Sequence, residues 1–95
     1  MATPEERVRA AIAKIDKGRR SVRLADIDRV ITHLRDDLGY AVSKSGKNNH
    51  FTYTVADGDE SYGFQVCDHH KGQSQLLVCY VTQFLNCMSA LGLLD

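Results

Sequence analysis

The hydrophobic residues of this chain change their spacing twice, and this change constrains the fold more than any other feature of the sequence. From residue 8 to 38 they recur every three or four residues, from 40 to 66 they alternate with small or polar residues, and from 77 to 91 the longer spacing returns. An α-helix repeats every 3.6 residues and a β-strand every two. The order helix, helix, three strands, helix is therefore predicted.

Capping residues mark the ends of the first two helices. Thr3-Pro4-Glu5-Glu6 is typical of a helix start, because Thr3 can accept from free backbone N–H groups and proline suits the first turn. Gly18 can end this helix. The second helix carries an apolar stripe from Ile27 to Leu38, and a basic connector at 17–23 joins the two helices.

Three strands are predicted near residues 40–44, 50–56 and 61–67. A polar link at 45–49 and the turn Asp57-Gly58-Asp59-Glu60 are short, which favours antiparallel pairing. A last helix is predicted over 77–91, closed by Gly92. The segment "LLVCYV" also fits the beginning of a fourth strand, since a short apolar run does not distinguish the two.

These elements predict an α+β fold in which helices cover one face of a three-stranded antiparallel sheet. The chain has 95 residues, which suits a single domain over 1–95. A sheet of this size leaves its other face open to water or a partner. If Tyr53 and Val55 point to the helices, the period of two places His50, Thr52 and Thr54 on the open face.

The sequence predicts a cytoplasmic protein without bound metal or cofactor. We find neither a secretion signal after Met1 nor an apolar run long enough to cross a membrane. The three cysteines lie mostly in apolar runs, which indicates reduced thiols used as small hydrophobic residues. The candidate zinc ligands lack the paired spacing of zinc sites; they are Cys67, His69, His70, Cys79 and Cys87.

Positive charge is concentrated in the first half of the chain. Residues 1–50 hold eleven Lys and Arg against seven acids, whereas residues 51–95 hold one Lys against five acids. A segment this basic can contact phosphate groups, and Arg19, Arg20 and Arg23 are the candidates. The alternative is a helix face and loop that are simply solvated.

Several segments between residues 25 and 93 together resemble the HicA family, small toxins of bacterial toxin-antitoxin pairs that cleave messenger RNA. They are a helix ending in "LGY", a histidine opening "HFTY", a second histidine in "CDHHKG", and the final "FLNCMSALGL". The resemblance implies a fold like that of double-stranded-RNA-binding domains, with residues 1–24 as an N-terminal helix and basic connector added to a core at 25–95. It also implies RNA and a HicB-like antitoxin as partners.

The same resemblance implies that His50 is the catalytic residue of a ribonuclease. The family's Gly-Ser-His is Asn48-Asn49-His50 here, with a glycine at Gly46. A histidine titrates near neutral pH, so it can transfer the proton needed when the 2′-OH of RNA attacks the neighbouring phosphate, and no metal is required.

Lys44 and Lys47 are neighbours of His50 in the sequence and are candidates to hold the phosphate. Three alternatives remain at this point. His50 can be a surface residue or a donor that stabilises the turn. The chain can be a non-catalytic RNA-binding or protein-interaction module of the same fold. It can also form a homodimer through its apolar C-terminal helix.

Overall fold

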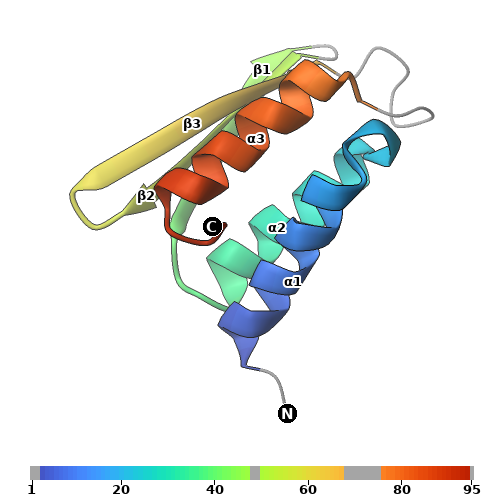
Figure 1. Cartoon of the computed structure of the whole chain (residues 1–95). Coiled ribbons are helices and arrows are strands. Elements are labelled where there is room, and N and C mark those ends of the chain that lie inside the picture. The colour runs from blue at the N-terminus through green and yellow to red at the C-terminus, as the bar shows by residue number, and fades with distance from the viewer. Residues whose placement is uncertain (1–2, 48–49, 68–75, 95) are drawn as a thin grey trace.

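The computed structural model describes residues 3–47, 50–67 and 76–94 and has the predicted order of elements. The helices are α1 (Pro4–Lys17), α2 (Leu24–Asp36) and α3 (Val78–Ala90), with a short 3-10 turn η1 (Arg19–Ser21) after α1. The strands are β1 (Ala41–Lys47), β2 (His50–Asp57) and β3 (Glu60–Cys67) (Figure 1). The predicted α+β fold with the order α-α-β-β-β-α is thereby confirmed.

Local side-chain chemistry explains where the first two helices begin. The Thr3 hydroxyl accepts from the backbone N–H of Glu6 at 3.2 Å, and Pro4 occupies the first turn of α1. At the start of α2, the carboxylate of Asp26 accepts from the backbone N–H of Arg23 at 3.0 Å. Both contacts satisfy backbone groups that a helix end leaves without partners.

The sheet is antiparallel in the order β1-β2-β3. Strand β1 continues to Lys47, so the polar link predicted at 45–49 is wrong for its first three residues; Asn48 and Asn49 lie outside the described residues. The segment "LLVCYV" forms no strand in its described residues. The backbone N–H of Leu76 donates to Val22 O at 2.7 Å, and α3 begins at Val78.

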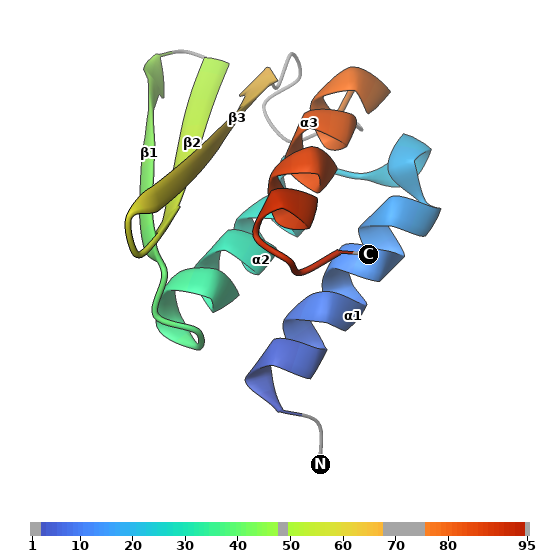
Figure 2. The ribbon, with the colours of Figure 1, turned by 60° about the vertical axis from the view of Figure 1, so that its left-hand side comes forward.

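The molecule has three layers (Figure 2). Helices α2 and α3 lie against one face of the sheet, α2 over β1 and α3 over β3. Helix α1 packs on α2 and α3, on the side away from the sheet. It contributes Val8, Ile12 and Ile15 to the hydrophobic cluster that also contains sheet residues, so α1 is part of the same core.

The inward and outward faces of the sheet agree with the period of two. Tyr53 and Val55 are fully buried under the helices, and the Tyr53 ring stacks on Phe64 with centroids 4.9 Å apart. Thr54 is half-buried and His50 and Thr52 are exposed, as predicted for the open face. Among the described residues, none of the helices is long and apolar enough to cross a bilayer.

Candidate functional site

His50 lies at the end of the sheet where β2 begins, between residues of both neighbouring strands. It is directly opposite Lys47 of β1 and Cys67 of β3. Residues paired across antiparallel strands point to the same face. The sheet therefore brings Lys47, His50 and Cys67 together on the face away from the helices, where Lys47 and His50 are exposed and Cys67 is buried.

A hollow of about 420 Å³ opens beside this histidine. Its volume is within the range of ligand sites in proteins. Helix α3 contributes one residue to the wall, Tyr80, and the strands contribute the others. The polar or charged lining residues are Lys47, His50, Thr52, Gln65, Cys67 and Tyr80.

The imidazole of His50 contacts a cysteine. Its Nε2 lies 3.7 Å from the Sγ of Cys67, which is almost completely buried. This contact holds one ring nitrogen against the sheet. Among the described residues, no hydrogen bond is formed by the Nδ1 of His50.

Gly46 lets β1 run close to the backbone of His50. Its φ of +146° is one that L side chains rarely adopt, and a Cβ placed there would lie 1.9 Å from the carbonyl oxygen of His50. A side chain at position 46 would therefore displace the first residue of β2. The glycine supports the position of His50 from the neighbouring strand.

Lys44, predicted to act beside His50, lies on the opposite face of the sheet. Its ammonium is 3.7 Å from the carboxylate of Asp28 and 4.5 Å from the centre of the Phe51 ring. The physical reason is parity: Lys44 and Lys47 are three residues apart in one strand, so they point to opposite sides. Of the two lysines, only Lys47 shares a face with His50.

The basic connector divides into one arginine with structural contacts and two exposed ones. Arg19 donates to Asp16 Oδ1 at 2.6 Å and to Thr82 Oγ1 at 3.3 Å, which ties η1 to α3. Arg20 and Arg23 are exposed, and among the described residues neither forms an ion pair.

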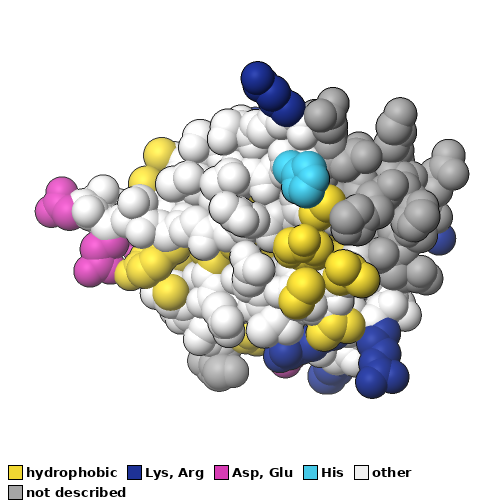
Figure 3. Space-filling model, turned by 90° about the horizontal axis from the view of Figure 1, so that it is seen from above, with side chains coloured by type: hydrophobic (Ala, Val, Ile, Leu, Met, Phe, Trp, Pro, Cys, Tyr) yellow, Lys and Arg dark blue, Asp and Glu magenta, His cyan; other side chains and the backbone are white. Residues whose placement is uncertain are grey.

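This connector lies beside the first turn of α3. The same turn contributes Tyr80 to the lining of the hollow. Figure 3 shows a histidine, hydrophobic side chains and several Lys and Arg side chains on this one end of the molecule.

Two exposed apolar residues next to this site were not predicted. Leu77 is 53% exposed and Val78 is 40% exposed, although the helical spacing placed Leu77 in the buried stripe. The helix begins only at Val78, and the neighbouring Leu76 is buried instead. The start of α3 thus presents an apolar patch, Leu77 and Val78, close to the hollow.

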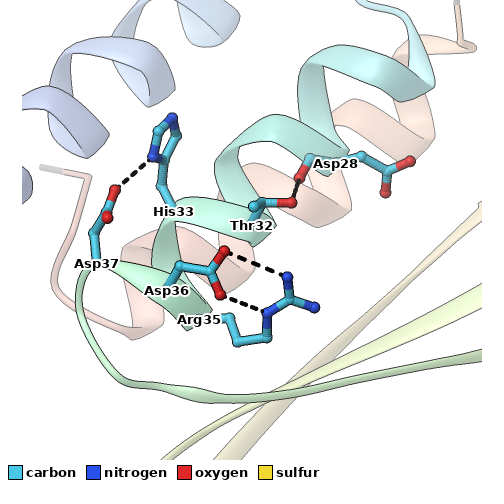
Figure 4. A network of polar contacts seen from close by, with 6 residues as sticks. All are labelled: Asp28, Thr32, His33, Arg35, Asp36 and Asp37. Carbon is cyan, nitrogen blue, oxygen red and sulfur yellow. Dashed lines mark hydrogen bonds and ion pairs between the residues drawn. The ribbon is translucent and has the colours of Figure 1, made fainter.

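The other described histidine belongs to a separate polar cluster on α2 (Figure 4). His33 is half-buried, and its Nδ1 lies 2.6 Å from the Asp37 carboxylate. In the same cluster the hydrogen bond from Arg35 lowers the pKa of Asp36. These exposed pairs stabilise the end of α2 and lie outside the hollow.

The cysteines are free thiols, and two of the three are buried as predicted. Burial raises the pKa of the Cys87 thiol to about 11. Cys79 is exposed, so the prediction of a buried thiol is wrong for it. Among the described residues, no group of three or more His, Cys, Asp or Glu could hold a metal ion; His69 and His70 lie outside those residues.

Comparisons with known proteins identify no relative of this chain. No family model, no curated protein and no solved structure matches the chain.

Proposed function

We propose that the protein is a HicA-like RNA-binding protein that cleaves RNA without a metal ion, with His50 as its catalytic residue. The observation that carries this proposal is the hollow of about 420 Å³, in which an exposed histidine lies directly opposite a lysine. An RNA phosphate held there would meet a proton acceptor and a positive charge at once.

The chemistry follows from the two side chains. His50 takes the proton from a 2′-OH, the 2′-oxygen forms a bond to the adjacent phosphorus, and the bond to the 5′-oxygen breaks. The leaving 5′-oxygen takes a proton from water, His50 returns its own proton to the solvent, and a 2′,3′-cyclic phosphate and a 5′-hydroxyl remain. Lys47 stabilises the negative charge that develops on the phosphate oxygens.

The surroundings of the hollow suit a single RNA strand. Tyr80 offers an aromatic ring on which a base can stack, and bases of single strands are commonly bound in this way. Arg20 and Arg23, beside the start of α3, would hold phosphates further along the strand. In this proposal the protein acts in the cytoplasm.

A second candidate function is a non-catalytic binding module, and the apolar patch favours it. Leu77 and Val78 are exposed next to the hollow, as expected for a surface that a protein partner covers. In a toxin-antitoxin pair that partner would be a HicB-like antitoxin, and in a homodimer a second copy of this chain. The two functions differ in what His50 does.

Replacing His50 separates them. We expect His50→Ala to lower the rate of RNA cleavage by about 10²–10⁴-fold, the usual effect of losing acid–base catalysis. Its free energy of unfolding should change by about 0.5 kcal/mol or less, because the side chain is exposed. We would measure cleavage of a labelled single-stranded RNA in the presence of a chelator, and thermal unfolding of the same samples.

His33→Ala is the matched control, since it removes a histidine that is also hydrogen-bonded but lies outside the hollow. It should leave cleavage unchanged. Equal cleavage by wild type and His50→Ala would end the catalytic assignment. If wild type binds RNA but does not cleave it, the non-catalytic module is the function.

A further inference from the structure

Cys67 is a hydrogen-bonding partner of the His50 imidazole, and the register of the sheet places the two side chains together. They are directly opposite each other in β2 and β3. The backbone N–H of Gln65 donates to the side chain of Gln83 in α3 and so not to β2. Because backbone groups alternate along a strand, the backbone of Cys67 also points away from β2. His50 and Cys67 therefore form a non-hydrogen-bonded pair, the kind that brings side chains closest together.

The two partners differ in exposure, and this difference decides which one can hold the other. Cys67 is only 3% exposed, whereas His50 is exposed. A densely packed side chain keeps one position, while an exposed imidazole changes rotamer easily in water. A buried thiol is also a poor nucleophile, because reactivity needs an accessible thiolate. The structure therefore favours a positioning role for Cys67 over a reactive one.

The contact also determines which ring nitrogen is basic. Either the thiol donates to Nε2, or Nε2–H donates to the Sγ, since a thiol is both a weak donor and a weak acceptor. In the first arrangement the unprotonated nitrogen is Nε2, which is already occupied by the thiol. In the second it is Nδ1, because a neutral imidazole carries one proton. Only the second arrangement leaves the sulfur contact intact while the ring accepts a proton from a substrate.

We propose that Cys67 is the positioning residue of His50: its sulfur accepts from Nε2–H, holds the ring in one rotamer, and makes Nδ1 the nitrogen that takes the proton from the 2′-OH. The last part of this inference rests on the proposed ribonuclease function. The orientation and the tautomer of the ring do not rest on it, so they are tested separately.

NMR of the full chain, labelled with ¹⁵N, tests the orientation and the tautomer without RNA. Protonated and unprotonated ring nitrogens have different ¹⁵N shifts, and three-bond couplings report the χ1 rotamer. At about pH 8.5, where histidines are ordinarily neutral, wild-type His50 should carry its proton on Nε2 and occupy one rotamer. Cys67→Ala should bring both properties towards those of a histidine in a short peptide. Cys67→Ser keeps an acceptor and should stay closer to wild type.

Cys87→Ala is the matched control, since it removes a thiol that is also buried but has no contact with His50. It should leave the ring shifts and couplings of His50 unchanged, whatever it does to stability. A wild-type ring protonated on Nδ1 would overturn the proposal. The same tautomer and rotamer in Cys67→Ala as in wild type would also overturn it.

Cleavage of a single-stranded RNA shows whether the orientation matters for catalysis. Cys67→Ala should lower kcat by about tenfold, the usual effect of losing a residue that orients a ligating or catalytic histidine. KM should change by less than about twofold, because Cys67 touches no substrate in this proposal. Cys67→Ala combined with His50→Ala should be no slower than His50→Ala alone, since the cysteine acts only through the histidine.

The two sets of measurements separate failure of this inference from failure of the proposed function. If wild type has the expected tautomer and rotamer but cleaves no RNA, the ribonuclease function fails and the positioning of the ring stands. If Cys67→Ala loses cleavage while the His50 ring is unchanged, or if the losses in the double variant add, the positioning role is wrong.

Discussion

At the scale of single residues, Gly46 and His50 are joined through the backbone. The carbonyl oxygen of His50 occupies the space that a side chain at position 46 would need. A glycine two residues before the Asn48-Asn49-His50 sequence therefore has a steric role. It allows close approach of β1, as glycines commonly do in sheets.

We expect Gly46→Ala to lower the free energy of unfolding by at least about 2 kcal/mol, because both its φ of +146° and the contact with His50 O oppose a methyl group. Gly58→Ala is the control: Gly58 also has positive φ, +66°, but a Cβ there meets no atom within 4 Å. It should cost only about 1 kcal/mol. Urea unfolding of both variants gives the comparison, and equal losses would contradict a steric role for position 46.

The thiol of Cys87 gives a pH dependence that can be measured. Its pKa is raised from 9.0 to about 11 by burial, so between these values the unfolded chain loses the proton while the folded chain keeps it. The stabilisation is fully present below pH 9 and is lost as the pH rises to 11. It amounts to at most about 2–3 kcal/mol.

Urea unfolding at pH 8, 9, 10 and 11 tests this expectation. The loss of stability above pH 9 should be smaller in Cys87→Ala than in wild type. Cys79→Ala removes an exposed thiol and should keep the wild-type dependence. Burial also raises the pKa of Tyr40 above its ordinary value, but all three proteins share that residue. The same pH dependence in Cys87→Ala and wild type would show that another group causes the loss.

At the scale of elements, the alternation of β1 and the contacts of η1 decide which cations are available to a ligand. Lys44 lies on the other side of the sheet from His50, where its ammonium contacts the Asp28 carboxylate and the Phe51 ring. Arg19 is held by Asp16 and Thr82. The cations left on the proposed RNA surface are Lys47, Arg20 and Arg23.

The connector should therefore respond unequally to replacement of its arginines. If Arg20 and Arg23 each contact a phosphate, Arg20→Gln with Arg23→Gln should lower the slope of log affinity against log salt by about 1.4 for a single-stranded RNA. Arg19→Gln should leave the slope unchanged. It should lower stability by about 1 kcal/mol, because it removes the contact between η1 and α3.

Fluorescence anisotropy with a labelled RNA between about 50 and 300 mM salt measures these slopes, and urea unfolding measures the stability. A slope that is unchanged in the double variant would place the RNA surface elsewhere. A slope lowered by Arg19→Gln alone would show that this arginine leaves its partners when RNA binds.

At the scale of the whole molecule, the three layers separate the proposed site from α1. The sheet end carries His50, Lys47 and the apolar patch at the start of α3. Helix α1 packs on α2 and α3, on the side away from the sheet. It therefore belongs to the core, through Val8 and Ile12, and contributes no residue to the lining of the hollow.

The sequence alone predicted the elements, their order and the direction of the side chains in β2. These properties depend on neighbours a few residues apart: the spacing of apolar residues, the capping group of Thr3, and the turn residues at 57–60. The alternation of side chains along β1 also places Lys44 and Lys47 on opposite faces of the sheet. This could be predicted only if the strand was known to continue to Lys47.

Only the tertiary structure decided which residues form the hollow beside His50 and which charges remain available. Arg19 is 63 residues from Thr82, and Tyr80 is far from His50 in the chain. Such residues meet only when α1 and α3 are correctly placed on the other layers. The apolar stripes in the sequence do not determine this placement, because they permit many relative positions of the helices. The packing of large buried side chains such as Tyr53, Phe64 and Phe84 selects one of them, because a dense core leaves few alternatives.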